Sequence, residues 1–182
     1  YHLRRGDSAQ IHKLLHSGSV RLGFVGAMLE PDSMTYFPML EDHLVMCTAN
    51  NPHYQALKKQ NVYGRDLLRE PTVAREEGSG TDRTVQSYMR NMGLADQDLH
   101  IVARVDDPEA IKRMTAQGVG VSVLSALSVA SEVDDGRLLT FPMDPQGLHR
   151  SIYLVYPRET ILSQSEQTFV RFCRQMAIRR NL

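Results

Sequence analysis

The sequence lacks an excess of charge, a long apolar run and any stretch of low complexity. Lysine and arginine together number 21, as do aspartate and glutamate, so the formal net charge is zero. Because nucleic-acid binding depends on a basic field, we expect this chain by itself to bind DNA poorly. A membrane span needs roughly 18 or more consecutive apolar residues, and no such run is present, so we expect no membrane partner.

Cysteine is also scarce. Its two occurrences, Cys47 and Cys173, stand far apart in apolar surroundings and form no Cys-x-x-Cys pair. This usage is typical of packed thiols in a reducing compartment, so we expect a cytoplasmic protein.

Motifs for catalysis and metal binding are missing as well. Gly78-Ser79-Gly80 is not a nucleophile elbow, and neither a Gly-x-x-x-x-Gly-Lys nor a His-Glu-x-x-His pattern occurs. His12 and His16 have the four-residue spacing of paired metal ligands on a helix, but no third ligand accompanies them, and both can equally flank an apolar face. We therefore expect no enzyme activity, no cofactor and no metal, with a small α/β enzyme left as a third possibility.

Two loops that combine glycine with hydroxyl side chains are present instead. Gly6-Asp7-Ser8 and Gly78-Ser79-Gly80-Thr81 each follow a predicted strand and precede a predicted amphipathic helix. The first N–H groups of a helix lack partners within the helix and carry partial positive charge, so such a loop favours an anion. Two loops of this kind predict one small anionic ligand held from two sides.

Strand and helix patterns alternate along the chain. Asp107-Pro108-Glu109 and the capping box Ser163 to Glu166 are strong helix starts, and Gly18, Gly93 and Gly118 are predicted helix ends. The final helix is predicted to bury one face of residues 169, 172, 173 and 176 against a sheet. The predicted strands cover residues 1–4, 20–26, 44–49, 72–75, 99–105, 119–124, 137–141 and 151–156, and the predicted helices cover 8–17, 54–60, 81–92, 108–117, 126–133 and 164–176.

This alternation predicts an α/β fold of two Rossmann-like lobes. The first strand, helix and strand read as a right-handed βαβ unit, so the sheet is predicted to be parallel and covered on both faces. The final helix needs the first lobe to lie against, so the chain is expected to cross between lobes twice. The predicted division is residues 1–47 plus 153–182 for lobe I and 48–152 for lobe II, with a hinge that implies closure around a ligand.

In order and spacing, several segments closely resemble the effector-binding domain of LysR-type transcriptional regulators. The resemblance spans nearly the whole chain, and its pieces are specific together although each is weak alone. They are Gly6-Asp7-Ser8 with Leu15 and Gly18, Leu22-Gly23-Phe24-Val25-Gly26, Glu41-Asp42-His43-Leu44-Val45-Met46, residues 75–93, residues 116–124, Glu132, and Gly136-Arg137-Leu138.

The resemblance implies a fold like the type 2 periplasmic binding proteins, with a small-molecule effector between two joined lobes. It also implies homodimers or homotetramers that bind DNA through an N-terminal winged helix-turn-helix domain. We expect that domain to be absent from this chain, together with the first strand and helix of lobe I. Arg21 and Ser125 depart from the family pattern, where an acidic residue and a proline are common, but neither position should define the ligand. Asn51-Pro52-His53 only approximates the family's usual His-Pro step, so the subfamily and the ligand stay open.

The predicted effector contacts are Ser8, Gly26 and Ala27 on the first lobe and Ser79, Gly80 and Thr81 on the second. Each has a plainer explanation: Ser8 as a helix N-cap, Gly26 as a loop glycine and the second loop as a flexible turn. Arg75, Arg83 and Gly118 are second-rank candidates for effector contact. The two arginines are ranked second because an exposed arginine is usually solvated. A solute-binding protein of a transport system, which has the same two-lobe architecture, is the alternative function.

Overall fold

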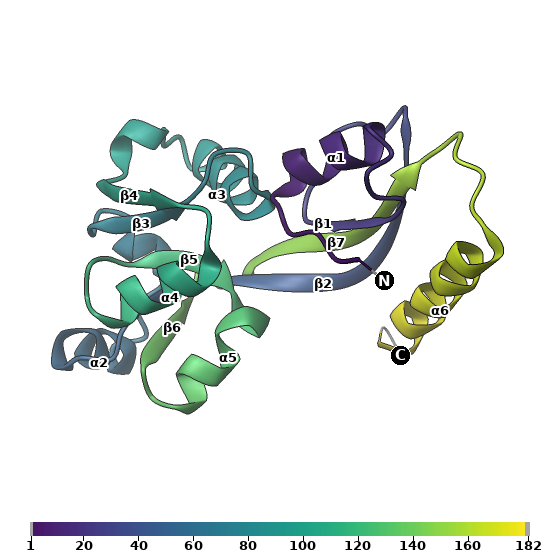
Figure 1. Cartoon of the computed structure of the whole chain (residues 1–182). Coiled ribbons are helices and arrows are strands. Elements are labelled where there is room, and N and C mark those ends of the chain that lie inside the picture. The colour runs from purple at the N-terminus through teal and green to yellow at the C-terminus, as the bar shows by residue number, and fades with distance from the viewer. Residues whose placement is uncertain (1, 181–182) are drawn as a thin grey trace. The chain divides into compact units, whose positions relative to one another are not determined.

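The computed structural model describes residues 2–180 and shows helices alternating with strands (Figure 1). Contacts between residues divide the chain into two compact units. Unit 1 comprises Tyr1–Glu41, Gly78–Gly80 and Ser151–Leu182, and unit 2 comprises Asp42–Glu77 and Thr81–Arg150. The predicted α/β class is confirmed. The predicted lobe boundaries, after residues 47 and 152, fall later in the chain than the points where the units divide.

Unit 1 is a small sheet with a helix on each face. Adjacent residues of a strand point to opposite faces, and Val155 packs against Leu15 of the first helix whereas Leu154 packs against Val170 and Cys173 of the last helix. The last helix therefore covers the first lobe's sheet, as predicted. Its elements are α1 (Ser8–His16), β1 (Gly23–Val25), the first part of β2 (Met34–Ala49), the last part of β7 (Leu148–Pro157) and α6 (Gln164–Arg180).

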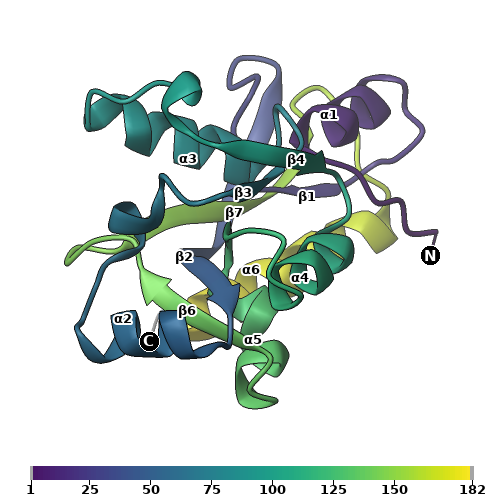
Figure 2. The ribbon, with the colours of Figure 1, turned by 90° about the vertical axis from the view of Figure 1, so that its left-hand side faces the viewer.

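Unit 2 holds the remainder of β2 and most of the helices. Helix α4 packs on β3, and α5 packs on β5 and β6 (Figure 2). Its core contains the fully buried Phe141, Met46 and Ile111. Its other elements are α2 (Pro52–Lys59), the 3-10 helix η1 (Gly64–Leu67), β3 (Thr72–Arg75), α3 (Gly80–Asn91), the 3-10 helix η2 (Asp96–Asp98), β4 (Ile101–Val105), α4 (Pro108–Ala116), β5 (Ser122–Ser125), α5 (Ala126–Asp134) and β6 (Leu138–Pro142).

Helix ends with strong local signals form where predicted. The Asp107 carboxylate accepts the Glu109 N–H at 3.1 Å, and Ser163 and Glu166 make the two reciprocal bonds of a capping box at 3.3 and 2.7 Å. Gly118, which follows α4, has a φ of +78°, a conformation that favours glycine. Among the described helices, none is both long and apolar enough to cross a membrane.

The predicted parallel sheet is wrong for most of the strands. Strand β1 pairs antiparallel with β7, and β2 pairs antiparallel with both β5 and β6. Parallel pairing joins β3 to β4, with a further bridge from Thr72 to Val121. In the sheet order β1-β7-β2-β5, the long strands β2 and β7 lie between β1 and β5. They pair antiparallel with these outer strands, whereas a βαβ unit predicts parallel pairing.

Two local predictions also fail. Residues 2–4 are irregular, with Leu3 almost fully exposed, because a strand requires a partner and these residues pair with none of the described strands; Tyr1 lies outside the described residues. On α6, Phe172 and Met176 are exposed, whereas Val170 and Cys173 are buried. The hydrophobic period on this helix is thus shifted, and its aromatic residues do not all face the sheet.

Candidate effector-binding site

A buried polar network in unit 2 fixes Thr81, one of the predicted effector contacts. The Arg150 guanidinium donates to the Thr81 hydroxyl at 2.9 Å through one nitrogen. Its other two nitrogens lie 2.9 and 2.8 Å from a carboxylate oxygen of Asp42. The other oxygen of Asp42 accepts the Ser125 hydroxyl at 2.6 Å. The network thus joins α3, β7, β2 and the end of β5.

Burial makes this network rigid and directional. The Asp42 side chain is 3% exposed and that of Arg150 is 15% exposed, so each charge depends on the other for compensation. The Thr81 oxygen accepts from a guanidinium, and its own proton therefore points away from Arg150. A hydroxyl held in this way is a donor for an acceptor such as a carboxylate or phosphate oxygen.

The segment before Thr81 is held by a close backbone approach within unit 1. Gly78 has a φ of +84°, and Ser79 is 1% exposed. A Cβ atom on Gly80 would lie 2.9 Å from the carbonyl carbon of Gly26, so the two glycines meet backbone to backbone. Gly26 and Gly80, both predicted contacts, are thus brought together, which the plain explanation of a flexible turn does not account for.

The first predicted loop ends in a network of hydrogen bonds. Asp7, not Ser8, is the N-cap of α1, because its carboxylate accepts the Gln10 N–H at 2.7 Å. Ser8 is buried, and its carbonyl oxygen lies 2.6 Å from Nδ1 of His12. The opposite nitrogen of His12 lies 2.5 Å from the Tyr36 hydroxyl. The N-cap explanation of Ser8 is therefore wrong.

Tyr36 continues that network toward the segment after Ala27. Its hydroxyl accepts the N–H groups of Leu29 and Glu30, both at 3.2 Å. If it donates its proton to His12, the histidine donates through Nδ1 to the Ser8 carbonyl, which is the neutral tautomer that satisfies both contacts. Gly26 and Ala27 are half-buried at the end of β1, just before this segment.

The paired-histidine interpretation of His12 and His16 can also be judged. Both ring nitrogens of His12 are already in contact with protein oxygens. His16 instead lies 2.5 Å from a carboxylate oxygen of Glu30. The hydrogen bond from His16 lowers the pKa of Glu30 below its ordinary value. The two histidines thus hold α1 to other segments of unit 1.

The second-rank candidates Arg75, Arg83 and Gly118 lie in three different environments. Arg75 makes a two-pronged ion pair with its neighbour Glu76, at 2.7 and 2.8 Å. Arg83 is exposed on α3, and Gly118 lies in the exposed turn after α4. Arg75 is the member of this group whose side chain lines a cavity near Thr81.

That cavity lies within unit 2 and measures about 40 Å³. A cavity of this size holds a few water molecules, whereas sites for organic ligands run from about 300 Å³ upward. The cavity by itself is therefore no effector site. It is lined by Met46, Leu68, Thr72, Ala74, Arg75, Thr81, Asp82, Val85, Gln86, Leu99, Ile101, Arg104 and Val123.

Both cysteines are buried and unpaired with each other. Burial raises the pKa of the Cys47 thiol to about 12, and it raises the pKa of Cys173 as well. Thiols of this kind stay protonated at neutral pH and are poor nucleophiles. The predicted packed thiols are confirmed.

Comparison with known proteins decides the family. Residues 1–177 match the LysR substrate binding domain profile. The chain belongs to the LysR substrate-binding domain family. This confirms the resemblance that the sequence segments carried.

Curated relatives of this LysR substrate-binding domain include the transcriptional activator CmpR of Synechocystis sp., 27% identical over 170 residues that cover 93% of the chain and 54% of CmpR. The phosphonates import ATP-binding protein PhnC of Anaeromyxobacter dehalogenans is 27% identical over 172 residues, 94% of the chain and 34% of PhnC. The chain thus spans about half the length of the regulators it matches and a third of PhnC.

Solved structures of the family confirm the fold. The regulatory domain of CcmR from Synechocystis PCC6803, solved in complex with 2-PG, is 26% identical with a TM-score of 0.79 and covers 94% of this chain and 79% of that one. The effector-binding domain of QuiR, solved with shikimate, is 16% identical with a TM-score of 0.82 and covers 96% of this chain and 79% of that one. The predicted two-lobe, periplasmic-binding-protein-like α/β fold is therefore confirmed.

Sequence reasoning missed two members of the Thr81 network. Arg150 lies at the start of β7 with no motif around it, and its partner Asp42 is 108 positions away. Ser125 stood out as a departure from the family's usual proline, and its hydroxyl donates a hydrogen bond to Asp42. That departure was the one available signal.

Proposed function

We propose that this chain is the effector-sensing domain of a LysR-type regulator and binds a small anion between its two lobes. The proposed contacts are Ser8, Gly26, Ala27, Ser79, Gly80 and Thr81. The observation that supports this most is the Thr81 hydroxyl, whose oxygen accepts from Arg150 and whose proton is thereby directed elsewhere. In this proposal that proton meets an oxygen of the effector.

The anionic character of the effector follows from donors at two helix starts. Ser8 opens α1, and Ser79 and Thr81 flank the start of α3; the N-terminal end of a helix carries partial positive charge. The related CcmR domain was solved with 2-PG. Both observations favour a small molecule that carries a carboxylate or phosphate group.

The proposed output is a change in lobe closure that alters the geometry of a homodimer or homotetramer. DNA would then be bound by a winged helix-turn-helix domain of the whole regulator, in the cytoplasm, and no catalytic step is needed. An effector must prefer the closed state by about 5.5 kcal/mol to move a two-state equilibrium from 1:99 to 99:1. The family assignment supports this regulator over a solute-binding protein of a transport system.

The test is a calorimetric titration with 2-PG, shikimate and inorganic phosphate, preceded by thermal-shift screening of small anions. For any anion that binds, Thr81→Ala and Ser8→Ala should each weaken affinity about tenfold or more, since a hydrogen bond to a charged group contributes about 1.5–3 kcal/mol. Melting curves of the ligand-free variants show whether the fold is kept.

Matched controls come from exposed hydroxyls elsewhere. Thr168→Ala on α6 and Ser87→Ala on α3 remove the same groups from solvated positions and should leave affinity unchanged. Equal affinity in Thr81→Ala and Thr168→Ala would remove Thr81 from the site. A domain stabilised by neutral or cationic compounds alone would contradict the anionic effector.

A further inference from the structure

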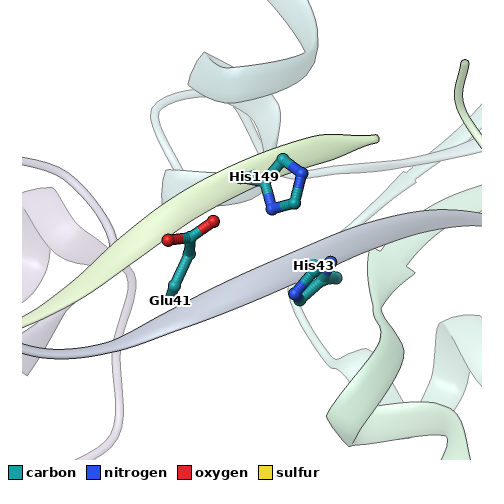
Figure 3. Close-up of side chains that lie close together, drawn as sticks. All are labelled: Glu41, His43 and His149. Atoms are coloured by element: carbon teal, nitrogen blue, oxygen red, sulfur yellow. The ribbon is translucent and has the colours of Figure 1, made fainter. Parts of the chain in front are cut away.

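Two exposed histidines face each other on neighbouring strands of unit 2. His43 lies on β2 and His149 on β7, and their ring centroids are 4.4 Å apart in an edge-to-face arrangement. Their ligand nitrogens lie within 4.8 Å of each other. Figure 3 shows both rings together with the carboxylate of Glu41.

Strand alternation supplies the third group. Glu41 stands two residues before His43 on the same strand, so both side chains leave β2 on one face. Asp42, between them, is buried on the other face, where it belongs to the Thr81 network. The two histidines and Glu41 are all exposed to solvent.

The tautomer of His149 suits metal binding. Its Nε2 lies 2.9 Å from the carbonyl oxygen of Gln146, which can only accept. In the neutral ring this places the proton on Nε2 and the lone pair on Nδ1. Histidine ligands of metals are commonly oriented by such a bond from the second nitrogen to a backbone carbonyl.

We propose that His43, His149 and Glu41 form a surface site for a divalent transition-metal ion such as Zn²⁺. Two imidazoles and one carboxylate are a donor set that Zn²⁺ accepts, with the fourth position left to water. Zinc–ligand bonds of about 2.1 Å place neighbouring donor atoms about 3.4 Å apart in a tetrahedron. The donor atoms already lie within 4.8 Å of one another, so rotation of exposed side chains brings them to that spacing without movement of the strands.

The bound ion would join β2 to β7 by a link additional to their backbone pairing. The two strands are neighbours in the same sheet, and they also carry Asp42 and Arg150 on the opposite, buried face. A metal on the exposed face would therefore stabilise the strand pair that holds the Thr81 network. This site rests on its own residues and not on the proposed effector function.

The test uses the untagged chain, since a histidine tag would compete, and titrates Zn²⁺ by calorimetry with a competing chelator. His43→Ala and His149→Ala should each lower the Zn²⁺ affinity at least about tenfold, because even loss of a residue that only orients a ligand costs 10–100-fold. Glu41→Gln should lower it less. Cu²⁺, which such nitrogen sites bind more tightly than Zn²⁺, provides a second readout: its electron paramagnetic resonance spectrum should show coupling to nitrogen that the double variant loses.

The matched control is His53→Ala, which removes another exposed histidine of unit 2, 62% exposed and outside the cluster. It should bind Zn²⁺ as the unaltered chain does, and all variants should melt like the unaltered chain without metal because these side chains are exposed. Equal Zn²⁺ affinity in the unaltered chain and the His43→Ala, His149→Ala double variant would overturn the site. Loss of affinity in His53→Ala to the same degree would overturn it as well.

Discussion

The two loops that look alike in sequence are held by different physical means. The Ser8 end of the first loop belongs to a hydrogen-bond network, in which His12 connects the Ser8 carbonyl to the Tyr36 hydroxyl. The Thr81 end of the second loop is held by a buried ion pair between Arg150 and Asp42. One sequence signal therefore produces two anchors, one made of hydrogen bonds and the other of charge.

This difference teaches that a helix-start motif specifies a local cap but not what fixes it in place. The anchors are supplied by residues far along the chain, and their chemistry sets how each loop responds to substitution, pH and salt. Removal of a charged partner leaves an uncompensated buried charge, whereas removal of a neutral partner leaves an unsatisfied dipole. The expected effects of substitution therefore differ in size between the two loops.

The largest effect should come from Asp42→Ala, which leaves Arg150 without its counter-charge. Breaking a buried pair costs about 3–5 kcal/mol, and the partial exposure of Arg150 favours the lower end, about 3 kcal/mol. Urea unfolding measures this loss. The control is Asp135→Ala, from the exposed pair of Asp135 with Arg137, which should cost less than about 1 kcal/mol. Similar losses in both variants would show that the second anchor does not depend on burial.

The next largest loss of unfolding free energy should come from the hydrogen-bond network at Ser8. Tyr36→Phe removes a hydroxyl that contacts His12, Leu29 and Glu30, so it should lower the free energy of unfolding by about 1–3 kcal/mol. Tyr156→Phe is the control, since no hydrogen bond to the Tyr156 hydroxyl is found among residues 2–180, and it should have a smaller effect. Chemical denaturation of both variants separates the two. A loss from Tyr36→Phe larger than that from Asp42→Ala would invert the comparison.

The glycines of the two loops provide a third contrast. Gly80→Ala places a methyl group against the backbone of Gly26, which cannot give way as a side chain can, so we expect a loss of about 1–3 kcal/mol. Gly6→Ala meets only the flexible side chain of Gln10 and should cost about 0.5 kcal/mol or less. Thermal and urea unfolding compare the two. Equal losses would mean that the Gly26 contact is not tight in solution.

The smallest expected effect is a change in the pH dependence of the unfolding free energy, and it arises from Glu132 in unit 2. Burial alone would raise the pKa of Glu132, but its hydrogen bond and ion pair with Lys112, at 3.0 Å, outweigh burial and lower it. A lowered pKa in the folded state adds stability above pH 4.5, and that stability is lost as the pH falls below 4.5 through the folded-state pKa.

Glu132→Gln should therefore flatten the decline of unfolding free energy between about pH 5 and pH 3, measured by urea unfolding at each pH. The half-buried Glu166 in unit 1, whose pKa is lowered by hydrogen bonds from Ser163, serves as the reference. Its replacement by glutamine should change the slope less, because its side chain is more exposed than that of Glu132, 21% against 9%, and solvent screens its charge more strongly. An unchanged slope in Glu132→Gln would show that Lys112 does not stabilise the charged carboxylate.

Local signals predicted most of the elements, while pairing between distant segments did not follow from the sequence. The starts of α4 and α6 depend on residues within a few positions, and both were predicted correctly. The first half of β2 was missed, because Pro38 and mixed polarity hide a strand whose residues from 35 to 41 are half-buried or exposed, without regular alternation. The antiparallel pairings of β1 with β7 and of β2 with β5 depend on contacts between distant segments, which no local pattern encodes.

The residues of the candidate site likewise fall into those that local sequence patterns identified and those that they did not. The hydroxyl and glycine residues were found from their helix-start pattern, and their role in effector binding stays a prediction. Arg150 and Asp42 were missed because an ion pair across 108 positions leaves no trace in either local sequence. The close approach of Gly80 to Gly26 was equally invisible, since spacing along the chain cannot show two backbones in contact.

That backbone contact has a consequence for redesign of ligand preference. A Cβ atom at Gly80 would lie 2.9 Å from the carbonyl carbon of Gly26, so any other residue at position 80 adds atoms to a space that this backbone already fills. If the proposed effector contacts are correct, a library aimed at a new effector should hold Gly80 constant and vary Ser8, Ala27 and Thr81. The backbone contact at Gly80 would then stay as it is, and ligand preference would change through the side chains of the other proposed contacts.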